Sequence, residues 1–113
     1  MDVSTTSDNR LQIVSIREPR IDAAVAIEFK DAMRSQTEGG PGIVVLDLSA
    51  VEFIDSSGLG AIVASMKYIG KERTLALAGL TPTVARVFQL TRMDSVFRLF
   101  PTLDGALAEL SAP

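Results

Sequence analysis

Residues 43–60 read IVVLDLSAVEFIDSSGLG, and the remaining predicted elements can be placed around this stretch. It begins with an unbroken apolar run that is rich in β-branched residues and too short for a typical helix, which predicts a central strand buried on both faces. After a short loop the chain enters a helical pattern that runs from Ser57 to about Ile69. The apolar residues of this pattern recur at helical spacing, at Leu59, Ile62, Val63, Met66 and Ile69.

Two adjacent serines, Ser56 and Ser57, fall at the start of this predicted helix. Side-chain oxygens are favoured there because the first backbone N–H groups of a helix have no partner within it. The positive end of the helix dipole also favours a negative group such as phosphate. We expect Ser57 to cap the helix and the hydroxyl of Ser56, just before it, to project outward, where it could carry a phosphate.

The composition limits the possible functions. A chain of 113 residues, 47% hydrophobic and with few aromatic side chains, predicts one α/β domain. The absence of Cys and His excludes thiolate metal sites, thiol nucleophiles and a Ser-His-Asp triad. A net charge of −3 argues against nucleic acid as a partner. No signal peptide or membrane-spanning run is present in the sequence, so we expect a cytoplasmic protein without direct membrane insertion.

The other predicted elements alternate between strands and helices. Residues 1–9 are expected to form an N-terminal arm or an edge strand, and residues 10–113 the main domain. A strand, a helix and a strand in succession imply a parallel arrangement. The expected elements are a strand over 11–16, a helix over about 23–36 capped by Asp22, a strand over 74–78, a helix capped by Thr81 with Pro82 at its first position, a strand over 96–100 and a helix capped by Thr102.

Two other interpretations of residues 43–60, a dinucleotide-binding loop and a nucleophilic serine, lack residues that their motifs require. Gly58-Leu59-Gly60 follows a strand and opens a helix, as in a dinucleotide-binding fingerprint, but Val63 occupies the third glycine position. Ser56 does not sit in a nucleophile elbow, because Ile54 stands where that motif needs glycine and no His is present to activate the hydroxyl.

Asp47 and Asp55 could act as paired carboxylates in acid–base or metal chemistry. A strand-end aspartate and a loop aspartate near a helix cap explain them more simply, and no third oxygen ligand lies nearby in the sequence. We therefore predict no metal, no cofactor and no enzymatic activity.

A strip of small side chains, Gly58, Ala61 and Ser65, lies opposite the apolar stripe of the predicted helix. Small residues allow close approach either by a partner protein or by a neighbouring helix of the same chain, and the sequence leaves both alternatives open. Gly58 and Gly60 each cost about 1 kcal/mol of helix propensity relative to Ala, which suggests a steric reason for them. We expect the strip to belong to a docking surface, since it neighbours Ser56 and lacks charge.

Residues 53–60, preceded by 45–48, closely resemble the signature of the STAS domain, and specifically that of the bacterial anti-sigma factor antagonists. The similarity continues more loosely toward the C-terminus and covers roughly residues 10 to 110. It implies a single STAS-like α/β domain in which a mixed β-sheet packs with about four α-helices. The further matching segments are 77–80, 84–93, 96–97 and 106–107.

The resemblance also implies a reversible serine switch. In that family the first serine of the motif, here Ser56, is phosphorylated by a partner that is both serine kinase and anti-sigma factor, and a separate serine phosphatase removes the phosphate. The unphosphorylated antagonist binds the anti-sigma factor, which then releases its sigma factor. Asp55 matches the motif aspartate and could orient the Ser56 hydroxyl or accept a loop N–H. The partner-binding residues expected with it are Asp22, Ser57, Gly58, Ala61 and Ser65.

One segment departs from the family pattern. Members usually carry a Gly-x-Leu-Asp-like segment before the first helix, whereas residues 19–22 read PRID, which keeps Asp22 and loses the glycine. That loop tends to lie beside the phosphorylation site in the family, so the departure bears on which partner binds. The alternative interpretation is a non-phosphorylated STAS subunit of a membrane transporter, of the type bound to lipid-transport ATPases. A small enzyme is a third, opposed by the missing His and Cys.

Overall fold

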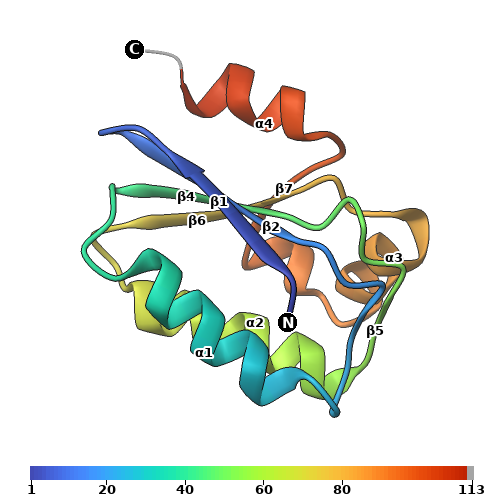
Figure 1. Ribbon diagram of the computed structural model, residues 1–113. Helices are drawn as coiled ribbons and strands as arrows, with labels where there is room; N and C mark the ends of the chain where they lie inside the picture. The colour runs from blue at the N-terminus through green and yellow to red at the C-terminus, as the bar shows by residue number, and fades with distance from the viewer. Residues whose placement is uncertain (112–113) are drawn as a thin grey trace.

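A computed structural model describes residues 1–111 and contains a five-stranded mixed sheet with strand order β1-β2-β4-β6-β7 (Figure 1). The edge strand β1 runs antiparallel to β2, and the other neighbouring strands are parallel. The predicted mixed sheet is therefore confirmed, and of the two alternatives for the N-terminus the structure has the edge strand. The strands are β1 (Val3–Ser7), β2 (Leu11–Ile16), β4 (Ile43–Asp47), β6 (Thr74–Ala78) and β7 (Arg98–Phe100).

The central strand β4 explains why its sequence is uniformly apolar. Val44 and Leu46 point into the larger core on one face of the sheet, whereas Val45 points into the smaller core on the other. All three side chains are fully buried. A strand covered on both faces needs apolar residues at every position, so the prediction from residues 43–60 is confirmed.

Helices cover the two faces of the sheet unequally. Three of them pack on one face, and α4 lies alone on the other (Figure 1). The four helices are α1 (Ala26–Thr37), α2 (Ser56–Ile69), α3 (Pro82–Leu90) and α4 (Leu103–Leu110). This arrangement confirms the prediction of about four helices around a mixed sheet.

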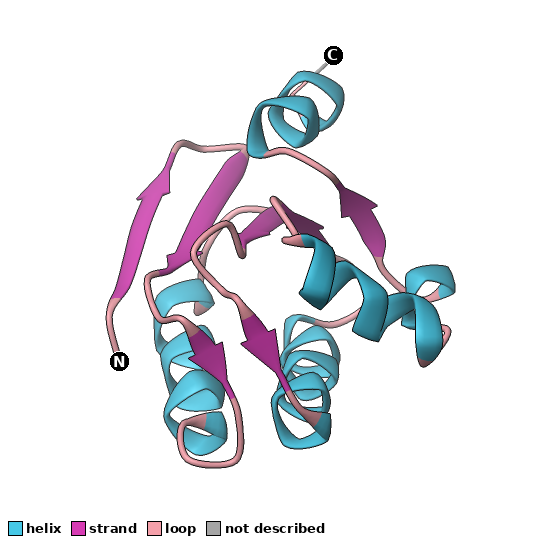
Figure 2. Cartoon of the chain, turned by 90° about the vertical axis from the view of Figure 1, so that its right-hand side faces the viewer, coloured by secondary structure: helices cyan, strands magenta, loops and turns pink. Residues whose placement is uncertain are grey.

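A second, two-stranded sheet was not predicted. Its parallel strands β3 (Arg20–Ile21) and β5 (Phe53–Ile54) lie side by side, and each leads toward the N-terminal end of a helix, α1 or α2 (Figure 2). The carbonyl of Pro19 accepts hydrogen bonds from the N–H groups of Glu52 and Phe53. This small sheet therefore holds the starts of α1 and α2 together.

Several predicted boundaries shift. Asp22 does not cap α1, because a turn intervenes and the helix begins at Ala26. Thr81 precedes α3 as expected, but its hydroxyl donates to the carbonyl of Val51 instead of capping the helix. Thr102 caps α4 as predicted, accepting a hydrogen bond from Gly105 N at 3.0 Å. Residues 112–113, the end of the expected main domain, lie outside the described residues.

The last strand is also shorter than predicted. A 3₁₀ turn, η1 (Met93–Ser95), precedes it, and Val96 keeps a helical backbone conformation with φ −94° and ψ −38°. The ladder with β6 therefore begins only at Arg98, which pairs with Ala76. The apolar spacing of residues 96–100 did not reveal this turn.

Candidate functional site

Asp55 joins the start of α2 to the loop before α1. One carboxylate oxygen, Oδ1, accepts a hydrogen bond from Gly58 N at 2.8 Å, which makes Asp55 the N-cap of α2. The other, Oδ2, accepts from Ala23 N at 3.2 Å. The expectation that Asp55 accepts a loop N–H is confirmed. The expectation that Ser57 caps the helix is wrong, because the carboxylate of Asp55 already satisfies the free N–H of the first turn.

These hydrogen bonds stabilise the charged form of Asp55. The N–H of Gly58 is the largest cause that lowers the pKa of the Asp55 carboxyl below its ordinary value, and the N–H groups of Ala23 and Ser57 act in the same direction. Partial desolvation opposes them. Because charged acceptors make the stronger hydrogen bonds, Asp55 holds the site as a carboxylate.

Ser56 is the first residue of α2 and Ser57 the second, and both side chains are exposed. Only the cap residue precedes Ser56, so its hydroxyl lies at the positive end of the helix dipole. The placement agrees with the expected outward projection of Ser56. The hydroxyl is therefore accessible from the solvent without any opening of the fold.

Gly58 has the steric role that its low helix propensity suggested. A Cβ atom at this position would lie 1.9 Å from the carbonyl oxygen of Ile21 and 2.9 Å from Cγ1 of Ile54. Both neighbours belong to the small sheet of β3 and β5. Gly58 thus allows α2 to start directly against that sheet, which fixes where Ser56 emerges.

The prediction that Gly58, Ala61 and Ser65 belong to a docking surface is wrong. Gly58 is buried, and Ala61 and Ser65 are each only 3% exposed. The Ser65 hydroxyl donates to the carbonyl of Ala61 at 2.9 Å, within α2 itself. The strip lies against the small sheet and α1, because α1 and α2 pack closely along their lengths (Figure 2). The absence of charge on this face reflects helix–helix packing.

Further exposed residues at this end of the molecule come from the loop tied to Asp55 and from the start of α1, a segment that the sequence did not single out. Ala23 and Ala24 are exposed in the loop tied to Asp55, and Ile27 in the first turn of α1 is 69% exposed. Phe29 and Met33 form the buried side of that helix, and Ile27 falls outside it. An apolar residue outside the buried side is the sequence signal that could have indicated a binding surface here. We call the exposed set Ala23, Ala24, Ile27, Ser56, Ser57 and Gly60 the Ser56 surface.

Asp22 and Arg20 lie at the edge of this surface. The Arg20 guanidinium stacks over the Phe53 ring at 4.8 Å and donates to Asp22 Oδ2 at 3.1 Å. Asp55 N in turn donates to the carbonyl of Ile21 at 3.4 Å. The expectation that residues 19–22 lie beside the serine is confirmed. Pro19 stands where family members usually have glycine, and the next residue, Arg20, stacks on Phe53.

The two aspartates considered for acid–base or metal chemistry belong to separate networks. Asp47 accepts hydrogen bonds from Ser49 N at 3.0 Å and from Ser15 Oγ at 3.2 Å, whereas Asp55 serves Gly58 and Ala23. Residues 1–111 contain no group of three or more carboxylates arranged to hold a metal ion. Within the same part of the chain, none of the helices has the length and apolar character needed to cross a bilayer.

The fold and the site together define a class: a small α/β module that presents an exposed serine at the first position of the helix after its central strand. The model of the STAS domain family matches residues 2–106. Anti-sigma-F factor antagonist RsfB from Mycobacterium tuberculosis (strain H37Rv) is 32% identical over 105 residues, which cover 93% of this chain and 85% of RsfB. The anti-sigma-B factor antagonist of Listeria monocytogenes is 29% identical over 70% of each chain.

A solved structure agrees with these sequence matches. The crystal structure of an anti-sigma factor antagonist from Mycobacterium paratuberculosis superposes with a TM-score of 0.87 at 32% identity, covering 98% of this chain and 94% of that one. The chain therefore belongs to the STAS domain family, among the anti-sigma factor antagonists.

Proposed function

We propose that this protein is an anti-sigma factor antagonist that works by partner switching. The unphosphorylated form binds an anti-sigma factor in the cytoplasm, and the anti-sigma factor then releases its sigma factor. The same partner acts as a serine kinase on Ser56, and a separate serine phosphatase restores the hydroxyl. The observation that carries the proposal is the exposed Ser56 at the first position of α2, in a chain whose relatives are named anti-sigma factor antagonists.

The chemistry of the switch belongs to the partner. Ser56 supplies only the acceptor hydroxyl, and its nearest acidic neighbour in sequence, Asp55, is occupied by hydrogen bonds from Gly58 and Ala23. The kinase must therefore provide the nucleotide, the metal and the base that takes the hydroxyl proton. The backbone bonds of Asp55 hold Ser56 in a fixed place for that active site.

The proposed binding surface is the Ser56 surface, with Asp22 and Asp55 at its edge. It combines small side chains with one exposed apolar anchor, Ile27, and so permits close approach of a partner. A phosphate on Ser56 adds about −1.5 to −2 charges at the edge of this apolar area, beside the charged Asp55. Burying that charge without a cation of the partner opposes association.

The test is phosphate transfer to the intact chain. The protein is incubated with ATP and each candidate anti-sigma kinase of the host, and the product is mapped by mass spectrometry. We expect one phosphate on Ser56, none in Ser56→Ala, and normal labelling in Ser57→Ala, which removes the neighbouring exposed hydroxyl as a matched control. Full labelling of Ser56→Ala would refute the assignment.

The same preparation separates the switch from the transporter alternative. The chain is captured from its host with its bound partners, before and after phosphatase treatment. Recovery of an anti-sigma factor only with the dephosphorylated chain supports partner switching. Recovery of a lipid-transport ATPase, with no labelling by any anti-sigma kinase, would replace the proposal with a transporter subunit.

A further inference from the structure

A cavity of about 530 Å³ lies at the end of α2 remote from Ser56. Its apolar lining comes from Met66 of α2, Leu75 of β6 and Val96, which precedes β7. The volume falls within the range of about 300–1,000 Å³ typical of small-molecule sites. Met66, the first residue of α2 in the lining, lies ten residues after Ser56, which corresponds to about 15 Å along the helix at 1.5 Å per residue.

The cavity exists because β7 starts late. The pairing of β6 with β7 begins at Ala76 and Arg98, so no β7 residue pairs with Thr74 or Leu75. The chain before β7 instead turns through η1, and Val96 remains 48% exposed at this open edge. The incomplete strand edge thus leaves Val96 exposed beside the half-buried Met66, with the buried Leu75 beneath them.

The rim of the cavity is cationic in a chain of negative net charge. Four of its lining residues, Lys67, Lys71, Arg73 and Arg98, carry positive charge, although the chain has only 11 such residues and a net charge of −3. No acidic residue belongs to the lining. The local charge is therefore opposite in sign to that of the whole protein.

Two of the four cations remain free to bind a ligand. Arg73 donates to the carbonyls of Pro41 and Thr37, and Arg98 pairs with Glu109 at 2.8 Å. Lys67 and Lys71 form no ion pair within residues 1–111. Lys67 also lies in the last turn of α2, where it offsets the negative end of the helix dipole.

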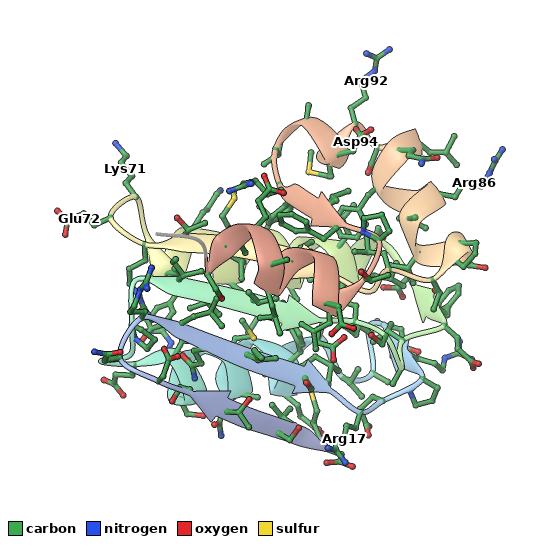
Figure 3. The ribbon with its side chains drawn as sticks, turned by 90° about the horizontal axis from the view of Figure 1, so that it is seen from above. Arg17, Lys71, Glu72, Arg86, Arg92 and Asp94 are labelled. Atoms are coloured by element: carbon green, nitrogen blue, oxygen red, sulfur yellow. The ribbon has the colours of Figure 1, made fainter. Side chains whose placement is uncertain are left out.

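The acidic groups closest in sequence to this rim, Glu72 and Asp94, both lie outside the lining. Glu72 shares the exposed turn with Lys71, but the two side chains point in different directions (Figure 3). Glu109 is held by Arg98. An entering anion therefore meets the two lysines without a competing carboxylate in the cavity.

We propose that this cavity binds an amphipathic anion, with a carboxylate or phosphate head on Lys67 and Lys71 and an apolar tail on Met66, Leu75 and Val96. The combination of an apolar floor and a few convergent charges is the usual composition of a small-molecule site. The proposal is independent of the Ser56 switch, because the two sites share no residue.

The direct test is calorimetric titration with decanoate below its micelle concentration. We expect saturable binding of decanoate, no binding of acetate, which lacks the tail, and no binding of decyltrimethylammonium, which reverses the head charge. Equal binding of acetate would reduce the site to general charge attraction. Equal binding of the cationic amphiphile would reduce it to an apolar surface. Either result overturns the proposal.

Charge-reversal variants locate the site. The double variant Lys67→Glu with Lys71→Glu should weaken decanoate binding by about tenfold or more, as expected when two exposed ion pairs become repulsive. The matched control reverses Arg86 and Arg92, which project from the α3–η1 region and do not line the cavity (Figure 3). It has the same net charge and should bind decanoate as tightly as the wild type. An equal loss of decanoate affinity in the two double variants would overturn the assignment of the site to Lys67 and Lys71.

Two further measurements separate the possible sources of the anion. Binding to vesicles that contain anionic phospholipid, without binding of monomeric decanoate or decyl phosphate, would show a membrane-surface patch and overturn the ligand site. Binding of both monomers supports it. Ser56→Ala should bind decanoate with unchanged affinity, so a failure of the proposed switch leaves this test intact.

Discussion

The two ends of α2 handle charge by different means. At the N-terminal end, backbone hydrogen bonds to Asp55 and the tight contact of Gly58 with Ile21 fix the position of Ser56. At the C-terminal end the helix stops at Gly70, which has φ +87°, and the charges there sit on flexible lysine side chains beside an open strand edge. The first end holds in a fixed position the hydroxyl that we propose is phosphorylated, whereas the second has the mobile charges and open edge to which we assign a reversible ligand.

The difference shows why small residues near an exposed serine need not form a binding surface. Gly58 and Ala61 are small because the N-terminal half of α2 packs directly on the small sheet and α1. The proposed partner surface therefore consists of exposed residues outside that contact, such as Ile27 and Gly60. Packing fixes the serine in place, and a neighbouring element supplies the exposed apolar area.

The largest effect is expected at the tight contact of the rigid end. Gly58→Ala should destabilise the fold by about 3 kcal/mol or more, because its Cβ would overlap the backbone carbonyl of Ile21 at 1.9 Å. Gly60→Ala is the matched control, since no atom lies within 4 Å of its Cβ position, and it should stabilise α2 by up to about 1 kcal/mol. Urea unfolding measures both. Equal stability of the two variants would show that the contact does not fix the helix start.

The next effect concerns binding and not folding. Ile27→Asp should weaken binding to the anti-sigma factor by about tenfold or more, which corresponds to about 1.4 kcal/mol, while its melting temperature stays within a few degrees of wild type. Leu90→Asp is the control, because Leu90 is exposed to almost the same extent, 71% against 69%, on α3. Calorimetric titration with the purified partner distinguishes them. Equal weakening by both substitutions would place the interface elsewhere.

A smaller effect is expected from acid. Hydrogen bonds, first that from Gly58 N, lower the pKa of Asp55, so its contribution to stability is complete above the ordinary aspartate pKa of about 3.9 and is lost as the pH falls through the lower folded value. The stability difference between wild type and Asp55→Asn should therefore shrink below about pH 4. Thermal melts from pH 6 to pH 2.5 measure it.

Asp8 provides the comparison for that experiment. The N–H groups of Arg10 and Leu11 lower the pKa of Asp8 as well, with Arg10 the larger cause, so Asp8→Asn should show the same pH trend. Only Asp55→Asn should also slow phosphorylation of Ser56, because only Asp55 holds the start of α2. Equal phosphorylation rates in the two variants would show that the helix cap formed by Asp55 has no effect on the phosphorylation of Ser56.

Periodicity and short motifs were enough to predict the main sheet and the four helices. Residues 43–47 were predicted to form the buried central strand because an uninterrupted run of apolar, mostly β-branched residues is typical of a strand covered on both faces. Thr102 was identified as a cap because it directly precedes apolar residues at helical spacing, Leu103, Ala106, Leu107 and Leu110. The motif at residues 53–60 is by itself specific enough to indicate the family and the candidate serine.

The errors have physical causes. Strands β3 and β5 contain two residues each, too few for any period to appear. Asp55, Ser56 and Ser57 are three adjacent cap-forming residues, and the sequence does not show which carboxylate or hydroxyl reaches the free N–H of Gly58. The small strip fitted both a partner interface and internal packing, and only the position of α1 decides between them.

The most direct test of the switch compares folding and binding on one phosphorylated sample. A phosphate at the first turn of α2 should be tolerated by the fold, gaining roughly 0.3–1 kcal/mol from the helix dipole. The same charge at a closed interface needs to oppose association by only about 3 kcal/mol to lower affinity more than about a hundredfold. We therefore expect Ser56-phosphorylated protein to melt within a few degrees of the unmodified form and to lose binding to the anti-sigma factor. Retained affinity, or a collapsed melting temperature, would contradict the account.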